Sequence, residues 1–227
     1  VDAAPTTEAR ALLLTDLVGS TRLAERLGDA AMAELNAAHD RAARDLLRAW
    51  GGREIDKTDG WLLLFDSVAA AVGCALAYHR AIAALPTPLA ARAGVHWGAV
   101  TLRANLPPDV AQGAKPLEVE GLAKPVAARV MSLAGAGQTL LTREAREQLP
   151  AAAWRVQAHG HWRIKGVAEP IELFEAGDEG APFVPPPDSG KVYRVVRRGE
   201  LWLPMRDVRH SLPAECVTPE ANTAASY

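Results

Sequence analysis

Apolar residues in the first part of the chain follow strand-like and helical patterns in alternation. Residues 11–17 form an almost continuous apolar run that closes with a threonine and an aspartate, which is typical of a buried strand. After a glycine-containing turn, apolar positions recur at helical spacing, first briefly and then over residues 29–50. Residues 53–65 contain an Asp-Gly pair followed by an apolar run, a combination that favours a β-hairpin.

The remaining pattern adds further strands and helices and ends in several strands. The predicted elements are helix 67–85, strands 93–96 and 100–103, helix 124–134, strand 138–141, helix 142–149, and strands 154–157, 161–164 and 171–174. The order βαββαβ with added strands indicates an α+β fold of ferredoxin-like type. We expect a mixed, mostly antiparallel sheet packed with helices.

The composition of the chain changes near residue 176. The following stretch is rich in glycine, proline and acidic residues, which is typical of a linker. Beyond it, apolar and polar residues alternate around Arg198-Gly199 and predict a small hairpin, which must dock on something because it cannot be stable alone. The predicted divisions are a lead-in at 1–10, a main domain at 11–176, a linker at 177–190, a hairpin extension at 191–215 and a disordered tail at 216–227.

Composition and charge describe an ordinary globular protein. The 227 residues are 49% hydrophobic and 23% charged, with a formal net charge of -2, which excludes general disorder and the basic surface of a general nucleic-acid binder. Cys74 and Cys216 are too few for a disulfide framework or a cysteine zinc site. Because the chain has no apolar run of membrane-spanning length and no secretion signal at its start, we expect a soluble, cytoplasmic protein without a membrane segment.

The first candidate for chemistry is Asp16, a carboxylate at the end of the first predicted strand. The turn that follows it, Val18, Gly19, Ser20 and Thr21, opens a helix, and a helix N-terminus offers free N–H groups to a phosphate. Asp16 would then hold a divalent ion against that phosphate. The alternative is that Asp16 or Ser20 only caps the helix.

The second candidate is Asp59 in the predicted hairpin turn. An aspartate before a glycine is most often turn chemistry alone. However, Asp16 and Asp59 both lie at strand ends and are separated by one helix and a crossing strand, so they are placed to meet on adjacent central strands. Magnesium sites in nucleotide chemistry use one or two such carboxylates together with substrate phosphates.

Several segments agree, in order, with the motifs of one known family. They are LLLTDLVGSTRLAERLGD, DGWLLLF, ARAGVHWGAV, GLAKPVAARVMSLAGAGQTLL and HWRIKGVAEPIELFE. Over roughly residues 11–176 the chain resembles the class III nucleotide cyclases, the catalytic domains of adenylate and guanylate cyclases. The resemblance implies the cyclase version of the ferredoxin-like fold.

The resemblance also implies roles for individual residues. Asp16 and Asp59 would hold two divalent metal ions, magnesium or manganese, and the Leu17 carbonyl would add a ligand. These ions would activate the ribose 3′-oxygen for in-line attack on the α-phosphorus. Arg129 matches the arginine that stabilises charge on the transferring phosphorus, and Lys165 matches a triphosphate-binding lysine.

Three positions depart from the family pattern. The base-reading lysine falls on Ile55, although Lys57 lies two residues further on and serves if the hairpin register differs. The second base-reading position falls on Glu118. The ribose-orienting asparagine falls on Pro125, which suits the first turn of a helix but has no group to donate. Loss of one such hydrogen bond to a transition state typically lowers a rate by about 10²–10³.

We therefore predict an enzyme that converts a nucleoside triphosphate to a 3′,5′-cyclic nucleotide and pyrophosphate for signalling. The resemblance makes ATP the first choice and leaves GTP and pyrimidine triphosphates open. It also implies a homodimer with sites at the interface. The alternatives are a degenerate cyclase that serves as a nucleotide-binding or dimerising module, and an interaction scaffold that works through the appended hairpin.

Overall fold

A computed structural model describes residues 5–58, 60–151, 154–165, 167–187 and 192–205. Its strands are β1 (Thr6–Leu17), β2 (Arg53–Lys57), β3 (Gly60–Phe65), β4 (Ala91–Ala104), β5 (Leu117–Glu120), β6 (Thr139–Thr142), β7 (Arg155–Ile164), β8 (Ile171–Gly177), β9 (Val192–Arg198) and β10 (Leu201–Pro204). Its helices are α1 (Ser20–Leu27), α2 (Asp29–Trp50), α3 (Val68–Ala83), α4 (Pro107–Ala111), α5 (Ala123–Leu133) and α6 (Arg143–Gln148). Among the described residues, no helix has the length and apolar character needed to cross a membrane.

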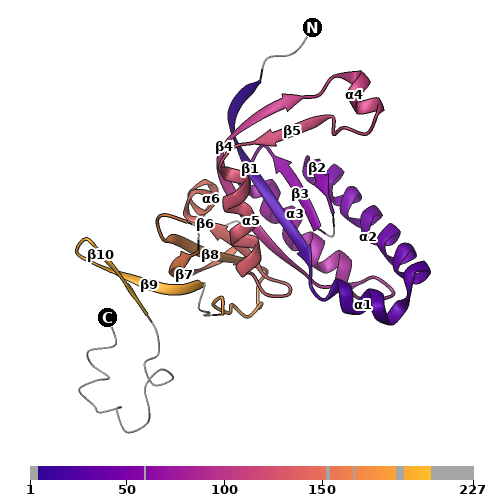
Figure 1. The fold of residues 1–227 in the computed structure, drawn as a ribbon. Coiled ribbons are helices and arrows are strands. Elements are labelled where there is room, and N and C mark those ends of the chain that lie inside the picture. The colour runs from indigo at the N-terminus through magenta and orange to yellow at the C-terminus, as the bar shows by residue number, and fades with distance from the viewer. Residues whose placement is uncertain (1–4, 59, 152–153, 166, 188–191, 206–227) are drawn as a thin grey trace.

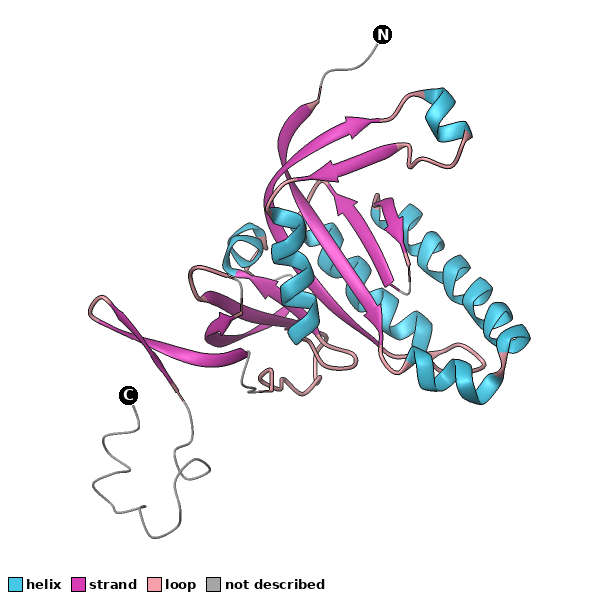
Figure 2. Ribbon diagram, in the orientation of Figure 1, coloured by secondary structure: helices cyan, strands magenta, loops and turns pink. Residues whose placement is uncertain are grey.

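All described strands join one sheet with the order β10-β9-β7-β8-β6-β4-β1-β3-β2, and β5 pairs with the outer half of β4 (Figure 1). The pair β4–β6 is parallel, and the other pairs are antiparallel. This architecture confirms the predicted α+β fold with a mixed, mostly antiparallel sheet. Figure 2 shows the helices packed around the sheet, with α4 at the tip of the arm formed by β4 and β5.

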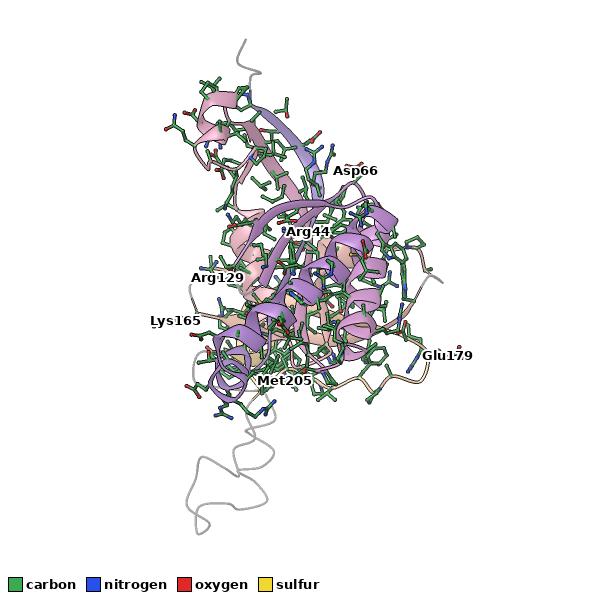
Figure 3. All side chains as sticks on the ribbon, turned by 90° about the vertical axis from the view of Figure 1, so that its right-hand side faces the viewer. Arg44, Asp66, Arg129, Lys165, Glu179 and Met205 are labelled. Atoms are coloured by element: carbon green, nitrogen blue, oxygen red, sulfur yellow. The ribbon has the colours of Figure 1, made fainter. Side chains whose placement is uncertain are left out.

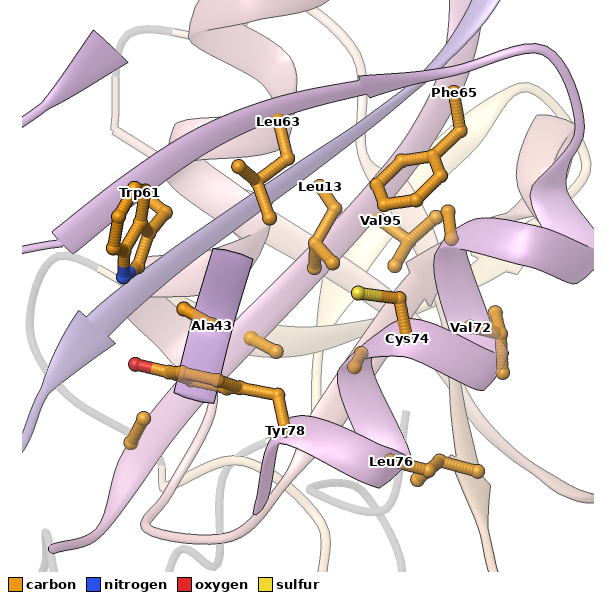
Figure 4. Close-up of a cluster of buried hydrophobic side chains, with 14 of the residues drawn as sticks. Leu13, Ala43, Trp61, Leu63, Phe65, Val72, Cys74, Leu76, Tyr78 and Val95 are labelled. Carbon is orange, nitrogen blue, oxygen red and sulfur yellow. The ribbon is translucent and has the colours of Figure 1, made fainter. Parts of the chain in front are cut away.

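Alternation along the central strand β1 assigns the two faces of the sheet. Leu13 belongs to a core cluster with α2 and α3, whereas Leu12 belongs to a second cluster with α5. Both leucines are fully buried, and each contributes about 1.5–3 kcal/mol through the hydrophobic effect. The cluster on the α2 and α3 face is drawn in Figure 4, and it includes Trp61, Leu63, Phe65, Val72, Cys74 and Tyr78. Burial raises the pKa of the Cys74 thiol to about 12, so this cysteine is a core residue and not a nucleophile.

Two predicted strand pairs are each one continuous strand. Residues 93–96 and 100–103 both lie in β4, because the backbone at Gly98 is extended and the chain does not turn there. The glycine is needed for space instead, since a Cβ at this position would lie 2.7 Å from His96 Nε2. The predicted strands 154–157 and 161–164 are merged in β7, which begins at Arg155, and a bulge between Ala158 and Gly160 absorbs the irregular pattern.

Residues 104–123, for which the sequence predicts no helix or strand, contain α4 and β5 of the arm. Pro107 and Pro108 begin α4, since prolines in a first helical turn cost no hydrogen bond. The following strand β5 returns along β4. The prediction missed both elements because each is only a few residues long.

The appended hairpin docks on the sheet, as its small size required. β9 pairs with β7 from His161↔Val195 to Ile164↔Val192, so it extends the sheet beyond β7. The chain before it contacts β8 at Val184, whose N–H donates to Glu175 Oε2 at 3.2 Å, and Gln138 donates to the Val184 carbonyl at 2.6 Å. The predicted tail at 216–227 lies outside the described residues.

Candidate functional site

Asp16 lies near the end of β1 and on the α5 face of the sheet, two residues beyond Leu14 of the same face. Its Cα is in register with Gly60 on β3 and with Arg92 on β4. The Arg92 guanidinium donates from Nε to Asp16 Oδ2 at 2.8 Å and from a terminal nitrogen to the same oxygen at 2.5 Å. The carboxylate is 19% exposed, so it is partly buried and already has a counter-ion.

A cavity of about 180 Å³ opens beside Asp16. Asp56 and Lys124 line it too, and its other lining residues are Leu14, Thr15, Thr58, Gly60, Trp61, Leu62 and Met131. One small cavity thus contains two carboxylates and an ammonium group. Carboxylates suit hard divalent cations, and a lysine suits phosphate, so the cavity matches a ligand that brings both.

A bulge in β2 decides which residues reach this cavity. Glu54 faces α2, where it pairs with Arg44 at 2.8 Å. Strict alternation would direct Ile55 toward α5, Asp56 toward α2 and Lys57 toward α5. The register shift between Glu54 and Asp56 instead directs both Ile55 and Asp56 toward α5, and Lys57 toward α2. A slip of one residue exchanges sheet faces.

Lys57 is therefore part of a polar network on the α2 side of the sheet. Its Nζ lies 2.7 Å from Asp40 Oδ2 and 5.7 Å from the centre of the Trp61 ring. The other oxygen of Asp40 lies 3.3 Å from His39 Nδ1, and His39 Nε2 lies 2.6 Å from the Tyr78 hydroxyl. Burial lowers the pKa of His39 and raises that of Tyr78, so both are neutral near pH 7. The base-reading role of Lys57 stays a prediction.

The other predicted base-reading position, Glu118, lies on β5 within a second polar group. Asn105 donates to Glu118 Oε1 at 3.3 Å and to the Lys115 carbonyl at 2.8 Å. The Lys115 ammonium lies 2.6 Å from Asp56 Oδ2 and holds the pKa of this carboxyl below its usual value. The arm is thereby tied to β2. Ile55, by contrast, is buried in the core and 6% exposed.

The turn after β1 is built on a glycine. Gly19 has φ 72° and is the N-cap residue of α1, which has no side-chain cap hydrogen bond. The capping alternative for Asp16 and Ser20 is therefore not realised. The Leu17 side chain is buried in the core. The residues predicted to meet a phosphate here are Val18, Gly19, Ser20 and Thr21.

Gly60 allows β3 to approach β1 beside Asp16. A Cβ at this position would lie 1.9 Å from the Thr15 carbonyl oxygen, so only glycine fits. Asp59, the second predicted metal aspartate, directly precedes Gly60 and lies outside the described residues. Within the described part of the chain, no three histidine, cysteine, aspartate or glutamate side chains gather closely enough to hold a metal ion.

Arg129 and Lys165 occupy the same edge of the molecule in Figure 3. Arg129 is half-buried on α5, and Lys165 is exposed after β7. Pro125 lies in the first turn of α5, where its missing N–H is tolerated. Within the described residues the Asp16 carboxylate is hydrogen-bonded to Arg92, and no bond joins it to Arg129 or Lys165.

Sequence reasoning missed Arg92, Asp56 and Lys124. The position of Arg92 beside Asp16 follows only from the register of β1 against β4. The position of Asp56 at the cavity follows only when the bulge in β2 is placed correctly. Lys124 precedes a proline at the start of α5, a position that places it at the cavity.

Comparison with known proteins identifies the fold. No protein-family model and no curated protein sequence matches the chain. An adenylate cyclase from Trypanosoma brucei, solved in its monomeric state, is similar over 78% of this chain and 92% of its own, with TM-score 0.69 and 22% identity. The adenylyl cyclase CyaB from P. aeruginosa covers 78% of this chain and 97% of its own, with TM-score 0.70 and 18% identity. The guanylate cyclase domain of RhGC from Catenaria anguillulae, solved with GTP, covers 76% and 98%, with TM-score 0.69 and 15% identity.

Proposed function

We propose that this chain, which has the fold of the class III nucleotide cyclase catalytic domains, converts a nucleoside triphosphate to a 3′,5′-cyclic nucleotide and pyrophosphate. The observation that carries the proposal is the position of Asp16. It lies at the end of a central buried strand, in register with Gly60, beside a cavity that also contains Asp56 and Lys124. ATP is the first choice of substrate. GTP is an alternative, since the similar structures include both adenylate and guanylate cyclases. Pyrimidine triphosphates stay open as well.

Two divalent ions, magnesium or manganese, would be held by the carboxylates of Asp16 and Asp59 and by the Leu17 carbonyl. The residues fit such ions because Asp16 presents a partly exposed carboxylate to a cavity with a second acid. When bound, the ions neutralise the triphosphate and favour ionisation of the ribose 3′-hydroxyl. The turn Val18, Gly19, Ser20 and Thr21 would border the phosphates.

In the reaction, the ribose 3′-oxygen loses its proton and bonds to the α-phosphorus, while the bond from this phosphorus to the bridging oxygen breaks and pyrophosphate leaves. Arg129 would stabilise the charge on the transferring group, and Lys165 would hold the triphosphate. Lys57 and Glu118 would contact the base. The resemblance to class III cyclases implies a site shared by two chains, so we expect a homodimer in which Arg129 and Lys165 of one copy meet the triphosphate held at Asp16 of the partner copy.

The test is product formation by the purified chain with each nucleoside triphosphate and Mn²⁺ or Mg²⁺, measured by mass spectrometry. We expect one cyclic nucleotide to dominate, and Asp16→Ala to abolish it. Asp178→Ala, which removes an exposed carboxylate paired with Arg80, is the matched control and should retain activity. Absence of any cyclic product with all triphosphates would refute the enzymatic proposal.

A second candidate is a nucleotide-binding module without turnover. It is favoured by Ile55, which is buried in the core at the base-reading position, and by Pro125, which has no hydrogen-bonding side chain. This candidate predicts triphosphate binding by calorimetry with no product. Pro125→Asn separates the two, because only a chain with residual cyclase chemistry gains rate from the restored amide.

A further inference from the structure

The Arg92 guanidinium is hydrogen-bonded to the carboxylate of Asp16, on which the proposed metal site depends. Two of its nitrogens donate to Asp16 Oδ2, at 2.8 and 2.5 Å. Charge-assisted bonds of this kind are among the stronger hydrogen bonds in proteins. An arginine keeps its charge at every pH at which a protein is folded, so the pair persists wherever Asp16 is ionised.

The fold fixes Arg92 in this position. Arg92 and Asp16 are direct partners in the β1–β4 ladder, so their backbones stay side by side, while the guanidinium can leave the carboxylate by rotation of the Arg92 side chain. A third guanidinium nitrogen lies 3.4 Å from the Ser132 carbonyl oxygen on α5, which holds the group from the other side. The Arg92 side chain is 35% exposed and that of Asp16 is 19% exposed, so water screens the pair only partly.

A divalent ion would bind the same carboxylate, in which the oxygen Oδ2 already accepts both hydrogen bonds from Arg92. Magnesium takes carboxylate oxygens in near-ideal octahedral geometry at about 2.0–2.1 Å, and a guanidinium nitrogen already in contact with that oxygen blocks part of the approach. The positive charge of Arg92 also repels the incoming ion. Lys124 lines the same cavity and adds to this repulsion, whereas the carboxylate of Asp56 is engaged by Lys115.

We infer that Arg92 is a positioning residue that competes with the divalent ion for Asp16. The nucleotide-free chain then binds metal weakly, because the guanidinium must first leave the carboxylate. The inference rests on the proposed metal role of Asp16 and assigns to Arg92 the control of metal affinity.

The experiment is a titration of the full chain with Mn²⁺ in the absence of nucleotide, with free Mn²⁺ followed by electron paramagnetic resonance. We expect Arg92→Gln to bind Mn²⁺ about tenfold more tightly than the unmodified chain. Arg92→Lys keeps the charge but loses the planar fork, so its affinity should lie between the two. Arg80→Gln removes a different arginine–carboxylate pair, between the last turn of α3 and Asp178, and is the matched control, with unchanged affinity expected.

Equal or weaker Mn²⁺ binding by Arg92→Gln would overturn the inference. If this variant does not melt cooperatively, Arg92→Lys decides alone, and an affinity no higher than that of the unmodified chain overturns it. Asp16→Ala separates this failure from failure of the proposed function. If Asp16→Ala binds Mn²⁺ as the unmodified chain does, the metal role of Asp16 is wrong; if it loses binding while Arg92→Gln is unchanged, only the competition is wrong.

Discussion

Gly94 lies where β4 passes directly beneath α5, and alanine at this position should destabilise the protein. A Cβ there would lie 2.3 Å from the backbone nitrogen of Met131 and 2.6 Å from its Cα. Ordinary contacts begin at 3.4 Å, so the helix backbone has to retreat by about 1.1 Å, the difference between the first distance and this limit. Backbone atoms cannot rotate away as a side chain can. Overpacking of this kind typically costs about 1–3 kcal/mol.

The assay is urea denaturation followed by circular dichroism. We expect Gly94→Ala to lower the free energy of unfolding by about 2–3 kcal/mol and the melting temperature by roughly 4–12 °C. Gly135→Ala is the matched control, because its Cβ would meet only Gln138 Oε1 at an ordinary 3.8 Å. A Gly94→Ala variant within 0.5 kcal/mol of the unmodified chain, roughly the spread of a neutral surface change, would refute the close packing of α5 on β4.

Three further substitutions test the core and the buried polar groups. Ile55→Lys should lower the free energy of unfolding by about 3 kcal/mol or more, since it places a charge in the core; urea denaturation checks this, and a stable variant would contradict the burial of residue 55 against α5. Tyr78→Phe should cost about 1–2 kcal/mol by removing the hydroxyl that lies 2.6 Å from His39 Nε2, and thermal melts would expose a neutral result. Burial lowers the pKa of His79 to about 4, so the unfolded chain binds a proton first and stability falls by up to about 3 kcal/mol as the pH falls from 6.5 to 4. In His79→Asn this pH dependence should be smaller, and an unchanged slope of unfolding free energy against pH would show that His79 titrates normally.

The fold was predictable where patterning and turn chemistry agree. Apolar runs and a glycine turn place α1, α2 and the second half of β1 correctly, and the Asp-Gly pair places the β2–β3 hairpin. β1 begins already at Thr6, within the predicted lead-in, because it continues to pair with β4 there. Gly98 and the bulge in β7 mislead, because a glycine in a strand looks the same in sequence whether the chain turns or continues. The arm was missed because short elements leave too little periodicity to detect.

The candidate site was predictable only in its local part. Asp16 follows from its position at a strand end. The pairing with Arg92 depends on a register between distant strands, and the choice between Asp56 and Lys57 depends on one bulged residue. Both are set by packing of the whole sheet and not by neighbouring residues.

The central place of β1 also determines when the site is completed as the chain folds. At Leu12 the strand pairs with Leu64 on one side and with His96 on the other. Its second partner strand, β4, therefore lies much further along the chain than β3. Pairing across such separations closes large loops, which is the slow part of folding. Asp16 and Arg92 therefore meet only when the longest-range ladder of the sheet is complete. Recovery of Mn²⁺ binding during refolding should accordingly lag behind the recovery of helical circular dichroism.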